Sequence, residues 1–475
     1  KEKPHLVLLD INLPNFDGFF WCRELRSISK VPIIFISARF SDMDQVMAIE
    51  NGGDDYIIKP FSFDLLLAKV KSAIRRVYGE YAENNSKDIY EADGVYLYKS
   101  QNTVGWQGKR IELSKKEFGT QRKIIEVLEN LDLDIRKAAG TGVIVELKGE
   151  KPGKTIAVRA DMDALAIEDE CGKSYQSQNK GACHACGHDG HIAMLLGVVK
   201  VLSNLRHKIQ GTVRFIFQPS EEEVADGSGA AAIIADGGLK DVDAIIGAHL
   251  WQPVKFGTVG ISAGPMMAAS DEFTIIIQGK AGHASMPHQT IDSILTASQI
   301  VVALNTIVGR DVDPMKQAVV SVGVFNSGHV YNSVAGRAEL KGTIRALDEN
   351  VRERVFDHIK KIVEDVCDMA GAKCKIERDV CTYVLVNDPN VTSVVLEAGK
   401  EVIGHKAHSI DPFMSSEDFS YYLQKVPGCF IFVGVDNPEK GIVYPQHHPK
   451  YDIDERAMVY GIEIMSSAAL KLLLN

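Results

Sequence analysis

The chain has 475 residues, of which 45% are hydrophobic and 24% charged, which is ordinary for a soluble protein of two to four domains. Its formal net charge of −10 argues against a broad nucleic-acid surface, because such surfaces depend on clustered Lys and Arg. No window approaches the roughly 18 uninterrupted apolar residues of a membrane span, and the start, KEKPHLVLLDINLP, lacks the apolar core of a signal peptide. The eight Cys are scattered rather than spaced as a disulfide framework, so we expect a cytoplasmic protein.

Residues 1–80 alternate short apolar runs with helical patterns. The predicted strands are Leu6–Leu9, Ile33–Ile36 and Tyr56–Ile58, and the predicted helices are Asp17–Ile28, Asp42–Asn51 and Ser62–Tyr78. This order predicts a parallel α/β domain, in which ligand sites lie at the carboxyl ends of the strands. Polar residues stand at those ends: Asp10, Ser37 and Lys59.

Through LVLLDINLPNFDG, VPIIFISAR and GGDDYIIKPF, this stretch resembles a response-regulator receiver domain, which has a flavodoxin-like fold. The resemblance implies that Asp10 is the phosphoacceptor, Ser37 the hydroxyl that follows the phosphoryl group, Tyr56 the switch aromatic and Lys59 the characteristic lysine. A receiver carries its Mg²⁺-binding acidic pair on an earlier strand, and only nine residues precede Asp10. We therefore expect a truncated receiver whose phosphoryl-transfer site is incomplete.

Residues 81–119 begin with a polar linker and continue with three predicted strands, Ile89–Leu97, Gln101–Trp106 and Lys109–Leu113. They resemble the leading sheet of the winged-helix effector that usually follows such receivers. No recognition helix follows, so we expect no element of this segment to enter the major groove of DNA.

From residue 120 onward the α/β pattern returns, with a helix at Thr120–Leu131, strands at Thr141–Lys148 and Lys154–Ala160, and an apolar helix at Ile192–Leu202. A block with a different pattern of apolar residues interrupts it. Amphipathic strands flank two long helices, which predicts an inserted α+β domain over residues 263–378 within a domain formed by 120–262 and 379–475. The predicted strands of the insert are Glu272–Gly279, Ala318–Phe325 and Arg337–Arg345, and its helices are Ile291–Val308 and Asn350–Ala370.

The run Gly181–His191, GACHACGHDGH, places thiols, imidazoles and a carboxylate before the apolar helix, which is typical of a metal site. Further candidate ligands recur at predicted strand ends. Glu221 and Glu222 follow the buried strand in VRFIFQPSEEE, His249 follows AIIGA, and His447 and His448 precede a proline. Each residue alone is more often a surface or structural group, and only their joint occurrence favours a metal centre.

The motifs RADMDALAIEDE, GACHACGHDGH, QPSEEE, GAHLW, GKAGHASMPH, GTIRALD, MSSEDFSYYLQKVPG and YPQHHPKYDIDE occur in one order. Together they resemble the M20 metallopeptidase family, in the branch of N-acyl-amino-acid, hippurate and auxin-conjugate hydrolases. The resemblance implies a dinuclear metal-dependent amidohydrolase that holds two divalent ions, Mn²⁺ or Zn²⁺. Its metal ligands would be Cys186 as the bridging thiolate, His188, Glu222, His249 and His447, with Glu221 as the general base.

The resemblance assigns further roles outside the ligand set. The inserted block is a lid domain in the family, and His283 would stabilise the developing oxyanion, sometimes from a partner subunit. Asn332 and Arg345 would bind the substrate carboxylate, and a homodimer would form through the lid. Asp163 either orients a ligand histidine or caps a helix. The remaining polar residues of the run are expected to support the site or the fold: His184, Asp189 and His191.

Three readings of function remain open on the sequence. The first is an amidohydrolase of N-acyl or N-aroyl amino acids or related small amides. The second is a phosphorylation-responsive, DNA-binding response regulator, which the missing acidic pair and recognition helix disfavour. The third is a non-functional chimera of truncated modules, since the joins between the modules fall inside predicted elements and the family's opening helix is absent.

Overall fold

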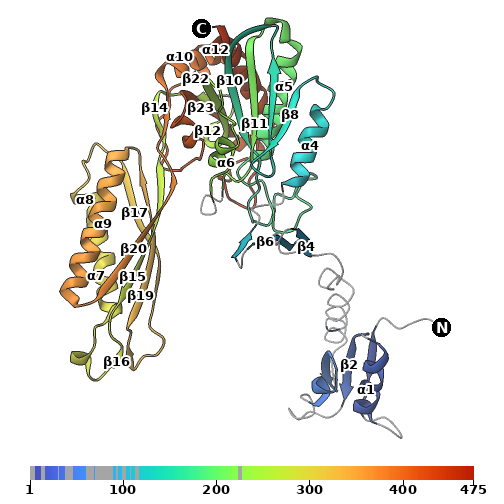
Figure 1. Cartoon of the computed structure of the whole chain (residues 1–475), viewed down its shortest axis with the longest axis vertical. Coiled ribbons are helices and arrows are strands. Elements are labelled where there is room, and N and C mark those ends of the chain that lie inside the picture. The colour runs from blue at the N-terminus through green and yellow to red at the C-terminus, as the bar shows by residue number, and fades with distance from the viewer. Residues whose placement is uncertain are drawn as a thin grey trace. The chain divides into compact units, whose positions relative to one another are not determined.

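The computed structural model describes residues 6–11, 17–29, 31–37, 47–59, 69, 89–92, 95–98, 103–106, 109–112, 117–222 and 227–474. The chain divides into two compact units, Lys1–Leu113 and Ser114–Asn475 (Figure 1). Most of the predicted helices Asp42–Asn51 and Ser62–Tyr78 lies outside the described residues.

The first unit contains a parallel three-stranded sheet in the order β1 (Val7–Leu9), β2 (Ile33–Ser37), β3 (Asp55–Ile58). Helix α1 (Gly18–Ile28) begins where predicted, because the Asp17 side chain accepts a hydrogen bond from the amide of Phe20 and so caps the first turn. Buried residues of the strands and of α1 form a small core of their own.

A separate antiparallel sheet follows, in the order β4, β5, β6, β7. Its strands are Ile89–Ala92, Val95–Tyr98, Thr103–Trp106 and Lys109–Glu112. The prediction of one strand over Ile89–Leu97 was wrong, because Ala92 pairs with Val95 in a hairpin. The Asp-Gly dipeptide at 93–94 is the sequence signal for that hairpin.

The second unit is built on an eight-stranded sheet in the order β22, β13, β23, β12, β10, β11, β9, β8. Its central strands run parallel: β23, β12, β10 and β11. From β10 to β12, strands and helices alternate along the chain, as predicted. The strands are β8 Asp134–Ala138, β9 Gly142–Lys148, β10 Lys151–Asp161, β11 Gln210–Gln218, β12 Ala244–Lys255, β13 Val259–Gly260, β22 Ala407–His408 and β23 Gly428–Asp436.

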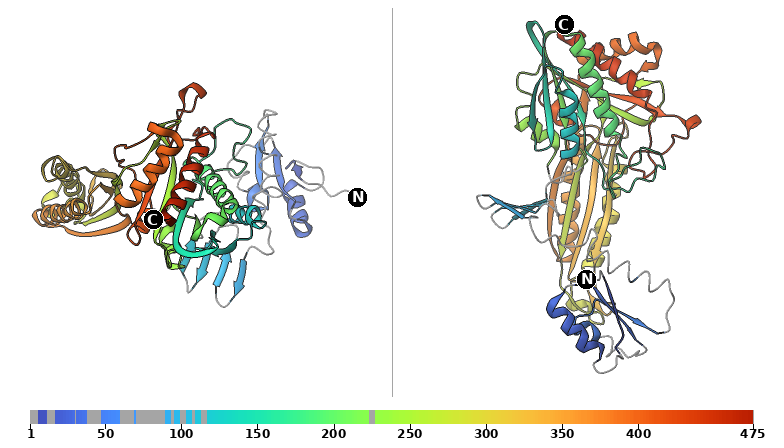
Figure 2. Two further views of the ribbon diagram at one scale, coloured as in Figure 1. Left: turned by 90° about the horizontal axis from the view of Figure 1, so that it is seen from above. Right: turned by 90° about the vertical axis from the view of Figure 1, so that its right-hand side faces the viewer.

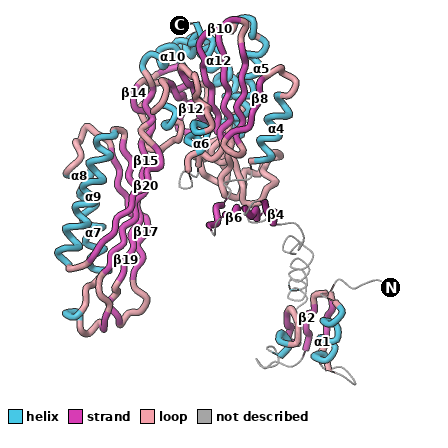
Figure 3. The backbone as a smooth tube through the Cα atoms, in the orientation of Figure 1, coloured by secondary structure: helices cyan, strands magenta, loops and turns pink. Residues whose placement is uncertain are grey.

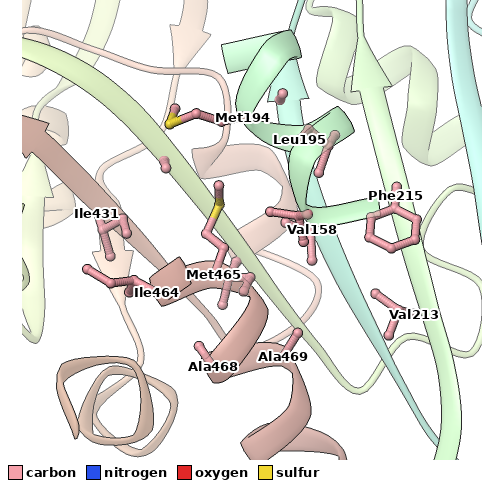
Figure 4. Packing of buried hydrophobic residues seen from close by; sticks show 14 of the residues in the cluster. Val158, Met194, Leu195, Val213, Phe215, Ile431, Ile464, Met465, Ala468 and Ala469 are labelled. Atoms are coloured by element: carbon pink, nitrogen blue, oxygen red, sulfur yellow. The ribbon is translucent and has the colours of Figure 1, made fainter. Parts of the chain in front are cut away.

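Helices cover both faces of this sheet. Successive apolar side chains of its central strands point to opposite faces, and those on both faces are buried. Ile156 and Val158 of β10 join the core beneath α5, α10 and α12, whereas Ala157 joins the opposite core with α6 and α11. The helices α5, α10 and α12 lie side by side (Figure 2), and their packing on the strands is shown in Figure 4. The helix bounds are α4 Phe118–Leu128, α5 His188–Asn204, α6 Gly229–Ala235, α10 Pro389–Ile403, α11 Ser420–Leu423 and α12 Ala457–Leu474.

The inserted block, which we call the lid, is a four-stranded antiparallel sheet in the order β17, β19, β15, β20, with helices packed on one face (Figure 3). Its sheet strands are β15 Ala269–Gln278, β17 Ala318–Ser327, β19 Arg337–Ala346 and β20 Lys373–Thr382, so the predicted boundary at residue 378 falls inside β20. A two-stranded ribbon of β14 (Gly264–Met267) and β21 (Leu385–Asn387) lies where the chain enters and leaves the lid. A short antiparallel sheet pairs β16 (Gly282–His283) with β18 (Ser333–Val334), although α7, α8 and β17 lie between them along the chain.

The lid helices differ in one respect from prediction. The single helix expected over Ile291–Val308 is two helices, α7 (Ser293–Leu304) and α8 (Thr306–Arg310), joined at Asn305. The long helix α9 (Glu349–Ala370) agrees with prediction, and Asp348 caps it by accepting hydrogen bonds from the amides of Asn350 and Val351.

Two stretches among the described residues are apolar and long enough to cross a membrane, Ser293–Arg310 and Ala457–Leu474. Both have other roles in this fold. The second is α12, whose Ile464, Met465 and Ala468 lie in the central core, and α7 in the first packs on the lid sheet. The core helix of a soluble protein meets the same criterion, so these stretches are only a weak indication of a membrane protein.

Candidate active site

The candidate ligands gather at one edge of the large sheet, where neighbouring parallel strands end. Asp161 is the last residue of β10, Glu221 and Glu222 lie shortly after β11, and His249 lies in β12. His447 comes from the long loop after β23, and its amide donates to the carbonyl of Ala185 at 2.7 Å. That bond ties the loop to the turn that carries Cys186.

The turn before α5 positions Cys186 and His188 on either side of a glycine. Gly187 precedes α5 with a left-handed φ of 88°, and a Cβ there would lie 3.0 Å from the Tyr451 hydroxyl. Only glycine adopts this backbone without strain. His188 becomes the first helical residue, four residues earlier than the predicted start at Ile192, and both His188 and Cys186 are buried.

The side chains of the five predicted ligands approach one another closely. Cys186 Sγ lies 3.4 Å from His249 Nε2, and Glu222 Oε1 lies 3.8 Å from His188 Nε2 and 3.2 Å from His447 Nε2. Two groups of potential ligand atoms share the thiol: one joins Cys186 to His188 and His249, and the other joins it to Glu222 and His447. A thiol common to two ligand groups could contact both ions of a metal pair.

Hydrogen bonds set the histidine orientations so that their outer nitrogens face this cluster. His188 Nδ1 lies 3.2 Å from Asp163 Oδ1, while the other oxygen of Asp163 accepts from the amide of Glu222 at 3.0 Å. His249 Nδ1 donates to the carbonyl of Leu250 at 2.8 Å. Both Nε2 atoms are thereby available as ligands, as in metal sites whose histidines are held by a carboxylate or carbonyl. Asp163 contacts His188, and it does not cap α5.

His191 does not point its nitrogens at the cluster. Its Nε2 accepts from the amide of Leu250 at 2.8 Å, so its Nδ1 carries the proton that Asp161 accepts at 2.6 Å. His191 therefore links the ends of β10 and β12, next to His249. Cys183 pairs through its backbone with Leu165 and is buried with Tyr451, so its side chain packs in the interior.

The buried atoms fit a metal centre. His188 Nε2 is buried and has no hydrogen-bond partner among the described residues. An imidazole nitrogen without a partner in a buried site is costly unless a ligand or cation binds it. With a thiol, three imidazoles and a carboxylate, the donor set suits divalent transition-metal ions.

The electrostatics of the site reflect burial and crowded carboxylates. Burial, reinforced by Glu417 and Glu222, raises the pKa of Glu221 well above its ordinary value, and burial also raises the pKa of the Cys186 thiol. Burial alone would lower the pKa of His188, but Asp161 and Asp163 raise it to about 10. Positive charge delivered by metal ions would be favourable in such a place.

A pocket of about 380 Å³ opens onto the cluster and joins it to residues from the lid. Arg345, near the end of β19, lines this pocket together with Thr382, Trp251 and Met267. Its side chain is half-buried, and the described residues give it no carboxylate partner. The guanidinium is therefore free to bind an anionic group of a ligand.

His283 and Asn332, two other predicted lid residues, do not line this pocket. They neighbour each other beside the β16–β18 sheet, where Ala284 N donates to the carbonyl of Asn332 at 3.1 Å. Both are exposed, and His283 Nδ1 lies 2.7 Å from the Ser285 hydroxyl. His288, which follows in a short helical turn, is exposed as well.

A buried ion network behind the cluster was not predicted from the sequence. Arg159 of β10, 1% exposed, donates hydrogen bonds to Asp161, Glu417 and Asp418 at 2.8, 3.0 and 2.9 Å. Glu417 also lines the pocket beside Glu221. An arginine within the apolar strand IAVRA was the available signal, because a buried charge requires partners.

In the first unit, Lys59 Nζ lies 2.6 Å from Asp10 Oδ2, and the amide of Lys59 donates to the carbonyl of Ser37. Ser37 and Tyr56 are buried. The structure thus brings the receiver-type residues together at the ends of β1, β2 and β3. Phosphorylation of Asp10 stays a prediction.

Comparison with known proteins agrees with this geometry. Residues 157–471 match the model of peptidase family M20/M25/M40, and residues 1–71 match the response regulator receiver domain. The chain belongs to peptidase family M20/M25/M40. As in other members, its centre is that of a metal-dependent hydrolase that cleaves amide bonds.

Individual relatives cover most of the second unit. The chain is 39% identical to a protein named thermostable carboxypeptidase 2 of Saccharolobus solfataricus, over 76% of this chain and 92% of the relative. It is 44% identical to the N-acyl-L-amino acid amidohydrolase of Geobacillus stearothermophilus, over 58% and 74%. A crystal structure of a Bacillus subtilis protein, described as a dinuclear metal-binding peptidase from the M20 family, superposes with a TM-score of 0.66 at 32% identity, covering 76% and 93%.

Proposed function

We propose that the pocket hydrolyses the amide bond of N-acyl or N-aroyl amino acids. The observation that carries this proposal is the pairing, in one pocket, of the five-ligand cluster with the uncompensated guanidinium of Arg345. An N-acyl amino acid has an amide bond that the ligand cluster could act on and a carboxylate that Arg345 could bind. Arg suits that role because its planar fork pairs with a carboxylate through two hydrogen bonds.

The ligands in this proposal are Cys186, His188, Glu222, His249 and His447, holding two ions of Mn²⁺ or Zn²⁺. When bound, these ions would polarise the scissile carbonyl and make hydroxide available near neutral pH. Glu221 would take a proton from the attacking water and deliver it to the amine nitrogen as the C–N bond breaks. Arg345 would fix the substrate carboxylate, so that the amide is presented to Glu221 in one orientation.

We further propose that the protein works as a homodimer in the cytoplasm. All eight cysteines are free thiols, which suits a reducing compartment. Helix α7 and the edge strand β17 carry exposed apolar side chains, which a second copy would cover: Ile294, Leu295, Val302, Val319, Val324 and Phe325. A partner copy would also supply His283 and Asn332, which do not line the pocket of their own chain.

The proposal is tested by Glu221→Gln in the metal-loaded protein with a panel of N-acyl amino acids. We expect kcat to fall about 10²- to 10⁴-fold, since proton transfer is lost, while elemental analysis still finds about two ions per chain. The matched control is Glu129→Gln at an exposed position, which should leave kcat unchanged. Full turnover by Glu221→Gln would refute its role as base. A folded wild-type protein that neither binds metal nor hydrolyses the panel after Mn²⁺ or Zn²⁺ addition would refute the function.

A further inference from the structure

Glu417 stands at the boundary between the pocket and the buried ion network. Its side chain is 2% exposed and lines the pocket, and its carboxyl group, that of Glu221 and that of Asp418 place oxygen atoms within 4.8 Å of one another. Such an approach of buried carboxyl groups is unfavourable if all are ionised, because like charges repel strongly where water is excluded.

The hydrogen bonds around Arg159 distinguish Glu417 from its neighbours. Asp418 accepts from four donors: Arg159, Gln218, the Ser228 hydroxyl and the amide of Ala230. Asp161 accepts from Arg159 and His191. The hydrogen bonds that both carboxylates accept therefore stabilise their ionised forms.

Glu417 has fewer donors, and both reach the same oxygen. Its Oε1 accepts from Arg159 Nη2 at 3.0 Å and from the amide of Phe419 at 2.9 Å. Within residues 117–222 and 227–474, no donor reaches Oε2. One guanidinium thus faces three carboxyl groups, and Glu417 is the one whose second oxygen has room for a proton.

We propose that Glu417 is a positioning residue for Glu221: held by Arg159 and the Phe419 amide through Oε1, it carries a proton on Oε2 and donates it in a hydrogen bond to the Glu221 carboxylate. This inference rests on the proposed function only for what the positioned Glu221 does. Burial raises the pKa of Glu417 to about 8 against the opposing effect of Arg159, and it also raises the pKa of Glu221, so the pair holds a proton at pH 7. Divalent ions bound beside Glu221 would favour its ionised form and leave the proton on Glu417. Hydrogen bonds of this kind are often long before substrate binds and then shorten.

The geometry makes glutamine an unusually close substitute for a protonated Glu417. The amide oxygen of Glu417→Gln would accept from Arg159 and Phe419, and its NH₂ group would take the place of the Oε2–H donor. Glu417→Met has a similar length and no donor. We expect Glu417→Gln to keep kcat close to that of the wild type, and Glu417→Met to lower kcat about tenfold or more with little change in KM, since a hydrogen bond to a charged group is lost.

Two further measurements do not depend on turnover. The infrared difference spectrum between wild type and Glu417→Gln at pH 7 should contain the carbonyl band of a protonated carboxyl group. Elemental analysis of both variants should find the wild-type metal content. As a matched control, Asp418→Asn replaces an acceptor for four donors and should lower the melting temperature, which Glu417→Gln should not.

Three results would overturn the proposal: no protonated-carboxyl band, a kcat for Glu417→Gln as low as that of Glu417→Met, or loss of metal from Glu417→Gln, which would make Glu417 a ligand. If Glu417→Met fails to fold, the activity of Glu417→Gln and the infrared band still test the proposed hydrogen bond. If the wild type hydrolyses none of the panel, the proposed function fails, whereas the infrared and stability results continue to test the hydrogen bond.

Discussion

Four of the five proposed metal ligands are held in place by hydrogen bonds to neighbouring groups. Asp163 contacts His188 and accepts from the amide of Glu222, so one carboxylate positions two ligands. The carbonyl of Leu250 determines which nitrogen of His249 is protonated. His447 has a left-handed φ of 64°, unusual for a residue with a side chain, and the bond from its amide to Ala185 holds that strained backbone.

Metal binding should release protons. In the metal-free protein, Asp161 and Asp163 overcome the effect of burial and raise the pKa of His188 to about 10, and burial raises the pKa of the Cys186 thiol. Below those values both groups are protonated, and both must lose the proton to bind a metal. We therefore expect affinity to increase with pH from 6 to 8, about tenfold per pH unit for each proton released.

The measurement is calorimetric titration of Mn²⁺ or Zn²⁺ in buffers of different ionisation enthalpy. Asp163→Asn is an informative variant, because removing this carboxylate should lower the pKa of His188 and reduce the number of protons released at pH 7. An affinity independent of pH across this range would contradict the assignment of His188 and Cys186 as ligands.

The element that organises the site is the start of α5. Because Gly187 takes up a left-handed conformation, the chain reverses sharply between Cys186 and His188 and directs both side chains to the cluster. The following turn packs closely on β12, where a Cβ at Gly190 would lie 2.4 Å from Leu250 Cδ1. The local backbone and its tight packing thus set the position of two ligands.

Gly187→Ala should lower both stability and metal affinity. The left-handed φ alone costs about 1–2 kcal/mol for a residue with a Cβ, and the added methyl group would contact the Tyr451 hydroxyl. Gly172→Ala is the matched control, because Gly172 has a φ of 67° and nothing within 4 Å of its Cβ position.

Thermal unfolding and competition with a metal chelator provide the measurements for this pair. Both variants should lose stability, and only Gly187→Ala should lose metal affinity. Equal metal affinities in the two variants would show that the turn geometry does not position Cys186 and His188.

On the scale of the second unit, residues that line the pocket come from two sheets. Arg345 and Thr382 reach the pocket from the lid, whereas the cluster belongs to the large sheet. His283 and Asn332 lie at a different part of the lid and need a second chain to act in catalysis as proposed. Dimerisation and activity should therefore be linked.

Val302→Glu should separate the proposed dimer. Val302 is 70% exposed on α7, and a buried, unpaired carboxylate at an interface is costly. We expect light scattering to show a shift from dimer to monomer and kcat to fall with it. Val459→Glu, at a half-exposed valine of α12, is the control and should remain dimeric. A wild-type monomer with full activity would contradict the proposal.

Much of the fold of this protein, and its family, can be predicted from the sequence. The order of apolar runs predicted the parallel sheet and its helices, Asp17 predicted the start of α1, and the motif order predicted the family and the ligand types. These features depend on neighbours within a few residues, which periodicity and capping report directly. The predicted single strand over Ile89–Leu97 and single helix over Ile291–Val308 were wrong, because short breaks are weak signals beside the apolar pattern around them.

Only the tertiary structure decided which polar residues meet. Arg159 and Glu417 are 258 residues apart yet share a hydrogen bond, and His191, which was expected only to support the site or the fold, links β10 to β12. The sequence by itself determined that the chain is an M20-type metal-dependent hydrolase and that the part after residue 120 carries the site. The orientation of each side chain was decided by packing between distant strands, because burial and hydrogen-bond partners, rather than spacing along the chain, set where a polar atom points.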